Sequence, residues 1–109
     1  MPWKGSFSFK NDQMCQTRIS ADIRLRVERL TPAIARVYFV NEAEEEIPVP
    51  QGFSVEDATN NVRVNPFGNS YFLAWSDNYE LSLNNESVIN VVNQRQWSIN
   101  AKSEVTNYF

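Results

Sequence analysis

The segment from Thr17 to Arg29 alternates between apolar and polar side chains more regularly than any other part of this sequence. Its inner odd-numbered positions are all apolar and its even-numbered positions are all polar, the apolar set being Ile19, Ala21, Ile23, Leu25 and Val27. A period of two is the period of a β-strand with one dry face and one wet face, and no helix gathers these apolar residues on one stripe. The pattern therefore predicts a strand over residues 17–29.

The run from Ile34 to Val40 is rich in Val, Tyr, Phe and Ile and admits two interpretations. A helix is one, because Thr31 is a suitable N-cap and Pro32 suits the first helical position. A strand is favoured by the β-branched and aromatic residues, and by the acidic residues that follow, which would lie at the negative end of a helix dipole. We therefore expect a hairpin of Thr17 to Leu30 against Ile34 to Val40.

Residues 41–60 form the longest connection. Its two prolines, in Ile47-Pro48-Val49-Pro50, favour extended backbone, because each proline keeps its predecessor out of the helical region. The segment Ser54-Val55-Glu56-Asp57 has the spacing of a capping box and would allow one short helical turn. Loops of this length in a compact domain are functional or are held by their own side chains, and we expect Phe53 to hold this one.

From Asn61 onward, short alternating runs are separated by turn residues. Asn65-Pro66-Phe67-Gly68 fits a type I turn, and Asn84-Asn85 fits the left-handed conformations of a tight hairpin. Short strands with turn signals every roughly 8–12 residues are typical of sandwiches and barrels. The sequence therefore predicts one mainly β domain over residues 1–109. We expect an antiparallel sandwich or small barrel of about eight strands, with at most one short helical turn in the 41–60 loop.

Residue usage limits the chemistry that this chain can perform. The sequence has no histidine, one cysteine and three glycines, which removes the commonest general base, a conventional zinc site and a glycine-rich phosphate loop. Without a histidine base, Cys15 is expected to be an incidental thiol rather than a nucleophile. The acidic cluster at residues 42–46 lacks the Asp, Asn and Gly spacing of a calcium loop, so we expect a solvated turn. We predict a protein that is not an enzyme and has no cofactor or metal.

Charge and chain termini bear on partners and location. The net charge of −3 argues against non-specific attraction to nucleic acid or to an anionic membrane. The first residues lack the apolar run of a secretory signal, and no segment approaches the roughly 20 apolar residues of a membrane helix. We therefore expect a cytoplasmic protein. Thirteen asparagines, a bias typical of phage and other viral proteins, make a viral or mobile-element origin our working hypothesis.

The candidate partner-binding residues are four arginines on the wet sheet face and one loop aromatic: Arg18, Arg24, Arg26, Arg36 and Phe53. Arg36 joins the other arginines only if the hairpin register allows it. Such a basic stripe would grip an acidic protein patch or a phosphate backbone. The alternative is a solvated face whose arginines pair with carboxylates such as Asp22 and Glu28, and the acidic net charge favours it.

Partner binding through the stripe has a mutational consequence. Replacing Arg24 and Arg26 by Glu would abolish that binding and leave thermal stability nearly unchanged, since solvated surface residues contribute little to folding.

These observations favour a protein-binding or assembly module that acts through a sheet face or edge, as an inhibitor-like adaptor or a structural component. Exposed strand edges also favour a homo-oligomer, because strand addition satisfies unpaired backbone groups. A small lectin-like carbohydrate-binding domain is the alternative, built from aromatic and Asn-rich loops. Against it, Trp75 and Trp97 alternate with apolar neighbours and are expected in the core.

Overall fold

The computed structural model describes residues 3–8, 14–74, 77–93, 96–101 and 105–108, with side chains described for residues 16–74 and 77–89. These residues form twelve strands and no helix. The strands are β1 (Trp3–Ser8), β2 (Met14–Ser20), β3 (Ile23–Arg29), β4 (Ile34–Val40), β5 (Glu46–Ile47), β6 (Phe53–Asp57), β7 (Val62–Val64), β8 (Tyr71–Ala74), β9 (Tyr79–Leu83), β10 (Glu86–Asn93), β11 (Gln96–Ala101) and β12 (Val105–Tyr108).

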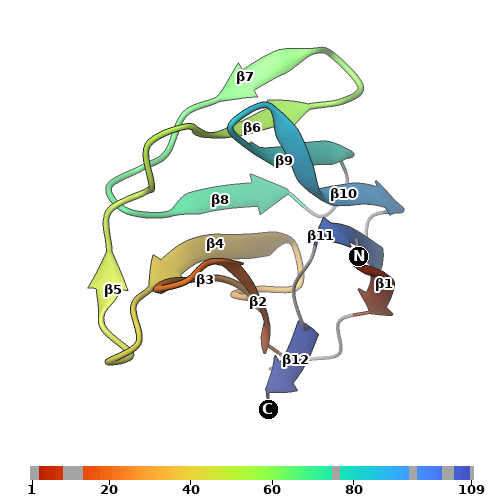
Figure 1. Ribbon diagram of the computed structural model, residues 1–109. Coiled ribbons are helices and arrows are strands. Elements are labelled where there is room, and N and C mark those ends of the chain that lie inside the picture. Colours follow the sequence, from red (N-terminus) through yellow and green to blue (C-terminus); the bar gives the residue numbers. More distant parts are fainter. Residues whose placement is uncertain (1–2, 9–13, 75–76, 94–95, 102–104, 109) are drawn as a thin grey trace.

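The strands are arranged in two antiparallel sheets (Figure 1). The first has the order β1-β11-β10-β9-β6-β7, and the second has the order β12-β2-β3-β4-β5 with β8 also paired to β4. β8 and β5 share one edge of β4, because β8 pairs with Ile34 to Val37 and β5 pairs with Phe39 and Val40. The sheets do not close into a barrel, so the sandwich-like, all-β architecture expected from the sequence is confirmed.

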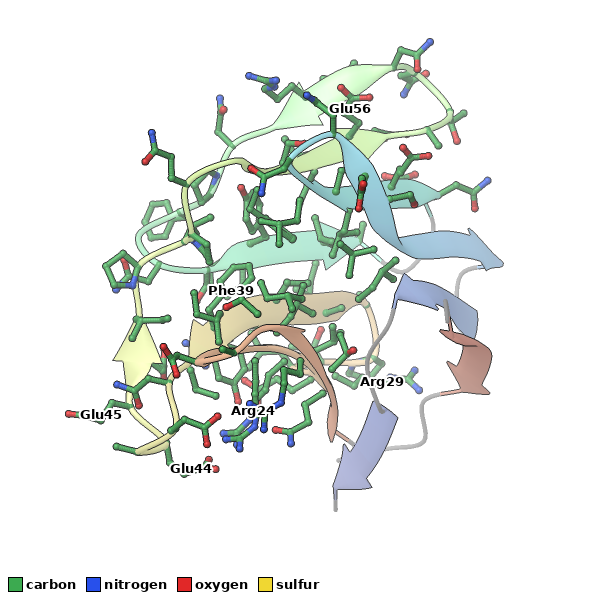
Figure 2. The ribbon with its side chains drawn as sticks, viewed as in Figure 1. Arg24, Arg29, Phe39, Glu44, Glu45 and Glu56 are labelled. Atoms are coloured by element: carbon green, nitrogen blue, oxygen red, sulfur yellow. The ribbon has the colours of Figure 1, made fainter. Side chains whose placement is uncertain are left out.

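The core lies between the two sheets and contains an aromatic cluster that joins them. Phe39 of β4 is fully buried between the layers (Figure 2). The Phe39 ring meets the Phe53 ring of β6 edge-on, with centroids 4.8 Å apart, and Phe53 lies 5.8 Å from the Tyr71 ring of β8. The Tyr79 hydroxyl of β9 adds a polar link by accepting a hydrogen bond from the Ala74 N–H at 3.2 Å. The buried aromatic contacts and this hydrogen bond therefore hold the two sheets in a fixed relative position.

Residues 17–29 are two strands, which corrects the single strand expected from their periodicity. β2 ends at Ser20, a two-residue turn follows, and β3 begins at Ile23. Such a turn alone would place Arg18 opposite Leu25, on the buried face. A β-bulge between Arg18 and Ser20 restores the phase, so that Arg18 lies opposite Arg24 and Thr17 lies opposite Leu25. Because a bulge adds one unpaired residue, the alternation continues unbroken through the turn and hides it.

The strand interpretation of residues 34–40 is confirmed. β3 pairs with β4 in continuous register, from Arg24 opposite Val40 to Arg29 opposite Ala35. The predicted hairpin of residues 17–30 against 34–40 is thus present with a shorter first arm.

Two local predictions in the later part of the chain were wrong, and one is confirmed. Residues 54–57, expected to allow a helical turn, belong to β6 and pair with β9. The turn expected at 65–68 lies further along, where Phe67 and Ser70 exchange backbone hydrogen bonds around Gly68 and Asn69. The Asn84-Asn85 turn is confirmed by φ angles of 51° and 66°.

Three of the strands beyond the predicted number of about eight are β2, which is separate from β3, and β5 and β6, which occupy the connection at 41–60. Trp75 lies outside the described residues, as do the side chains of Trp97 and Cys15. In the part of the chain that the structure describes, no helix has the length and apolar character needed to cross a membrane.

Candidate functional site

The four candidate arginines lie on the outer face of the second sheet. Arg18 and Arg24 are directly opposite each other on β2 and β3, and strand alternation puts Arg26 on the same side. Arg36 of β4 lies opposite Glu28 of β3. Glu28 is two residues from Arg26 on the same strand, and residues two apart on a strand point to the same side. The register therefore places Arg36 on this face. We call this set the arginine face. Its role in binding a partner stays a prediction.

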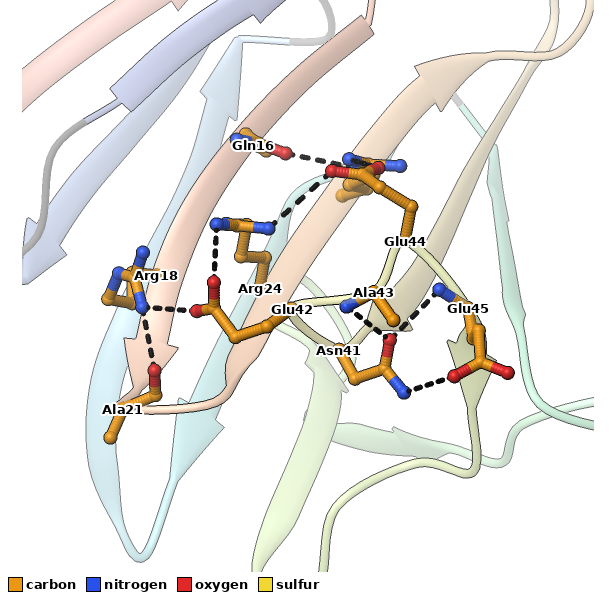
Figure 3. A network of polar contacts seen from close by, with 10 residues as sticks. Gln16, Arg18, Ala21, Arg24, Asn41, Glu42, Ala43, Glu44 and Glu45 are labelled. Atoms are coloured by element: carbon orange, nitrogen blue, oxygen red, sulfur yellow. Dashed lines mark hydrogen bonds and ion pairs between the residues drawn. The ribbon is translucent and has the colours of Figure 1, made fainter.

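An acidic loop at residues 41–45 folds over the arginine face and neutralises it (Figure 3). The two carboxylate oxygens of Glu42 accept hydrogen bonds from Arg18 Nη1 at 2.7 Å and from Arg24 Nη2 at 3.1 Å. Glu44 forms an ion pair with Arg26, and its other oxygen lies 3.6 Å from Arg24 Nη1. The arginine face is therefore not an open basic stripe.

Arg36 at the other end of the face is also paired. Its guanidinium forms ion pairs with Glu46 of β5 and with Glu28 Oε1, the latter at 3.3 Å. Glu28 is thus a cross-strand partner, as the sequence anticipated. Asp22, also anticipated as a partner, makes no ion pair among the described residues. The loop carboxylates were missed, and the signal that could have found them is the sequence of four glutamates following a strand pair rich in arginine.

Asn41 gives the acidic loop its shape. Its side-chain Oδ1 accepts hydrogen bonds from the backbone N–H groups of Ala43, at 3.0 Å, and Glu45, at 2.9 Å. Its Nδ2 donates to Glu45 Oε1 at 3.1 Å. Glu44 adopts a left-handed conformation with φ of 65°, which is uncommon for a residue with a side chain. The loop is therefore pre-shaped to turn its carboxylates toward the sheet, rather than being only a solvated turn.

The pKa shifts of Arg26 and Tyr38 agree with an arginine face whose positive charges are paired with carboxylates. Burial alone would lower the pKa of Arg26, but the hydrogen bond and charge of Glu44, together with Tyr38, outweigh it and raise that pKa. Burial and the neighbouring Glu28 carboxylate raise the pKa of Tyr38, whose ring lies 4.0 Å below the Arg36 guanidinium carbon. At neutral pH the arginines are charged and Tyr38 is neutral.

The acidic loop makes stability depend on pH below neutrality. The hydrogen bond from Arg18 and the charge of Arg24 lower the pKa of Glu42 from its ordinary value of 4.5. A depressed folded-state pKa contributes stability that is present above pH 4.5 and is lost as the pH falls through the lowered pKa. We expect thermal melts between about pH 6 and pH 2.5 to show a shallower loss of Tm for Glu42→Gln than for the wild type. Glu45→Gln is the matched control, and an equal slope for both variants and the wild type would contradict this assignment.

Phe53 lies in the core rather than on the surface. Its side chain contacts Phe39 and Tyr71 and holds the end of the 41–52 connection between the sheets, as expected of a residue that pins a loop. With 8% of its surface exposed, it offers a partner little contact area. Its predicted role in partner binding gains no support from this position.

Two other phenylalanines are exposed and were missed by sequence reasoning. Phe67 is 82% exposed and Phe72 is 43% exposed, and their ring centroids lie 6.4 Å apart in an edge-to-face arrangement. Phe72 lies on β8 opposite Arg36, so this aromatic pair borders the arginine face. The available signal was the alternation of residues 71–73, in which buried Tyr71 and Leu73 flank an outward-facing phenylalanine.

A pocket of about 550 Å³ opens at the end of the first sheet nearest to the Asn84-Asn85 turn. The connection before β6, the segment after β7 and that turn form its walls, and Phe53 and Tyr71 line it from the core side. Across the described residues, no group of three or more His, Cys, Asp or Glu side chains is placed to hold a metal ion.

Comparison with known proteins assigns no family to this arrangement. No protein-family model matches the sequence, and no curated protein and no solved structure matches it significantly.

Proposed function

We propose that this chain is a non-catalytic protein-binding module and that its contact surface is centred on Phe67 and Phe72. The observation that carries the proposal is the exposure of 82% of the Phe67 side chain in a tightly bonded hairpin. The Phe67 N–H donates to the Ser70 carbonyl at 2.7 Å, and the Ser70 N–H donates back at 3.2 Å. The chain thus holds a large apolar ring in water on a fixed turn, at a cost that burial in a complex would remove.

The surroundings of this aromatic pair match the anatomy of protein interfaces. Aromatic residues and arginine are enriched in such contacts, and the energetic centre is apolar with a polar rim. Here the apolar centre is Phe67 and Phe72, and Arg36 with its carboxylate partners supplies the adjacent rim. This arrangement supports an aromatic centre with the arginine face as its border.

The geometry favours the aromatic pair over the arginine face as the binding centre. An acidic partner would have to displace Glu42 and Glu44 before it could reach Arg24 or Arg26. The net gain from exchanging one ion pair for another is small. A partner that binds at Phe67 has no ion pair between described residues to displace. It gains free energy directly, because burial of the exposed ring removes apolar surface from water.

Affinity capture from the native host, followed by size-exclusion chromatography with light scattering, tests the proposal. Replacing Phe67 and Phe72 by Ser is expected to weaken binding of a captured partner, or of a second copy, by at least about tenfold, which is roughly 1.4 kcal/mol. The free energy of unfolding should change by less than about 0.5 kcal/mol, because both rings are on the surface. Val62→Ser is the matched control, being a 54% exposed apolar residue on the other sheet.

The outcome is decided by where binding is lost. Undiminished binding by the Phe67→Ser, Phe72→Ser variant would overturn the proposal, and loss of binding in Val62→Ser would then transfer the contact surface to β7.

A further inference from the structure

The pocket at the end of the first sheet is rich in side-chain amides. Four of its lining residues carry them: Gln51, Asn65, Asn84 and Asn85. A carboxamide offers both donors and acceptors of hydrogen bonds. Its volume of about 550 Å³ falls inside the range of roughly 300–1,000 Å³ that is usual for small-molecule sites. The pocket therefore has both the size and the bonding capacity of a ligand site.

The backbone around the pocket fixes its rim. Gly52 has a φ of 88°, and a Cβ atom added there would lie 2.2 Å from Asn84 Oδ1. The Asn84 N–H also donates to the Gly52 carbonyl at 2.9 Å. Only glycine allows the Asn84 side chain to lie so close to this backbone. The Asn84-Asn85 turn is thus held against the connection before β6, which fixes the backbone that carries two of the four amides.

Tyr71 brings a polar group to the pocket from the core. The residue is only 3% exposed and lines the pocket, and its hydroxyl lies near enough to Arg63 for that charge to act on it. Burial raises the pKa of this hydroxyl, and the nearby Arg63 charge opposes that shift without cancelling it. The hydroxyl is therefore protonated at neutral pH and can donate a hydrogen bond. A hydroxyl that lines a pocket can make this bond to water or to a ligand.

Arg63 supplies the positive charge of the pocket. It projects from β7, lines the pocket and makes no ion pair within the part of the chain that the structure describes. Its cross-strand neighbour is Glu56 of β6, but no ion pair joins the two. This sets Arg63 apart from the arginines of the arginine face, which are all paired. An unpaired guanidinium beside neutral donors is suited to a carboxylate.

We propose that this pocket binds an acidic monosaccharide unit, with its carboxylate on Arg63 and its hydroxyl groups on the pocket amides and the Tyr71 hydroxyl. Sugar hydroxyls both donate and accept hydrogen bonds, and this matches the four carboxamides. A single guanidinium balances one carboxylate, whereas a phosphate dianion would leave one charge uncompensated. Val64 and Pro66, with the small exposed part of Phe53, give the pocket apolar surface for the C–H faces of the ring.

An acidic peptide is the competing occupant, and the pocket chemistry favours the sugar over it. A peptide side chain would bring one carboxylate but few hydroxyl groups, so most of the amide donors and acceptors would return to water. The proposal is independent of the aromatic contact surface, because Phe67 and Phe72 do not line the pocket.

Titration of the ¹⁵N-labelled full chain, followed by NMR, tests this site. The probes are methyl glucuronide, methyl galacturonide and the methyl glycoside of N-acetylneuraminic acid, with methyl glucoside and N-acetylglutamate amide as comparisons. We expect saturable shifts at residues of the Asn84-Asn85 turn and β7 with at least one acidic sugar. Binding of methyl glucoside and of N-acetylglutamate amide should be at least about tenfold weaker, since each lacks one half of the recognition chemistry.

Variants separate the roles of the two key side chains. Arg63→Gln is expected to weaken acidic-sugar binding at least tenfold and to reduce the preference over methyl glucoside, while Tyr71→Phe is expected to weaken it about threefold to tenfold. Glu56→Gln, on the same hairpin, is the control and should bind within about twofold of the wild type. The Phe67→Ser, Phe72→Ser variant should bind the sugar normally, so failure here and failure of the protein-binding proposal are distinguishable.

Three results would overturn the proposal. They are no saturable shift with any acidic sugar at about 20 mM, equal binding by Arg63→Gln and the wild type, and tighter binding of N-acetylglutamate amide than of every sugar.

Discussion

Replacing Phe39 by Ala is expected to lower the free energy of unfolding by about 3–5 kcal/mol, the range for removing a buried phenylalanine ring. Phe39 is fully buried on β4, and its edge-on contact with Phe53 joins the two sheets. This loss of stability has two causes. The hydrophobic free energy gained by burying the ring is absent, and a cavity remains between the two sheets because they cannot fully collapse. For a domain of this size such a loss is a large part of the total stability. Urea unfolding followed by circular dichroism measures it directly.

Phe67→Ala is the matched control, because it deletes the same ring from the surface. Phe67 is 82% exposed, so its replacement should change the free energy of unfolding by less than about 0.5 kcal/mol. Equal effects of the two substitutions would contradict the placement of Phe39 between the sheets.

Replacing Arg24 and Arg26 by Glu is expected to destabilise the protein by about 2–4 kcal/mol. Arg26 is 8% exposed, pairs with Glu44 and donates a hydrogen bond to Gln16 Oε1 at 2.9 Å. The new carboxylates would face Glu42 and Glu44, so attraction becomes repulsion in a partly buried setting. Breaking a buried pair costs about 3–5 kcal/mol, and exposure of the loop carboxylates reduces that figure. The sequence alone led to the opposite expectation, a nearly unchanged stability.

A charge swap distinguishes repulsion from lost packing. Adding Glu42→Arg and Glu44→Arg to the double variant should restore at least about 1 kcal/mol, measured as the coupling energy of a double-mutant cycle. Arg63→Gln is the control, since it removes an exposed arginine that has no ion pair in the described structure, and should change stability by less than about 0.5 kcal/mol. A double variant as stable as the wild type would show that the acidic loop does not pair with the sheet.

The fold was predictable because its determinants are local. The alternation around Leu25 and Val27, and the left-handed preference of Asn84-Asn85, depend on neighbouring residues and are visible in the sequence. The turn at Ala21 and Asp22 was not, since the bulge lets the alternation run through it. The capping-box spacing at residues 54–57 was overridden by pairing with β9, because tertiary context outweighs local propensity.

The candidate site was less predictable because it depends on contacts between distant residues. Arg18 and Glu42 are 24 positions apart, and nothing local to either residue indicates that the 41–45 loop folds back. The exposure of Phe67 likewise follows from a turn displaced along the chain. The pocket near Arg63 joins four separate segments, so composition indicated its amides without indicating their position.

The bulge in the β2–β3 hairpin has a consequence for how chains of this type can differ in length. Ile19 is the extra residue between the Arg18–Arg24 and Ser20–Ile23 pairs. A relative lacking that one residue would keep every earlier pairing and every inward or outward orientation. Losing a residue between Met14 and Thr17 instead would exchange the two faces of the preceding part of the strand. Natural insertions and deletions in this hairpin should therefore concentrate at position 19.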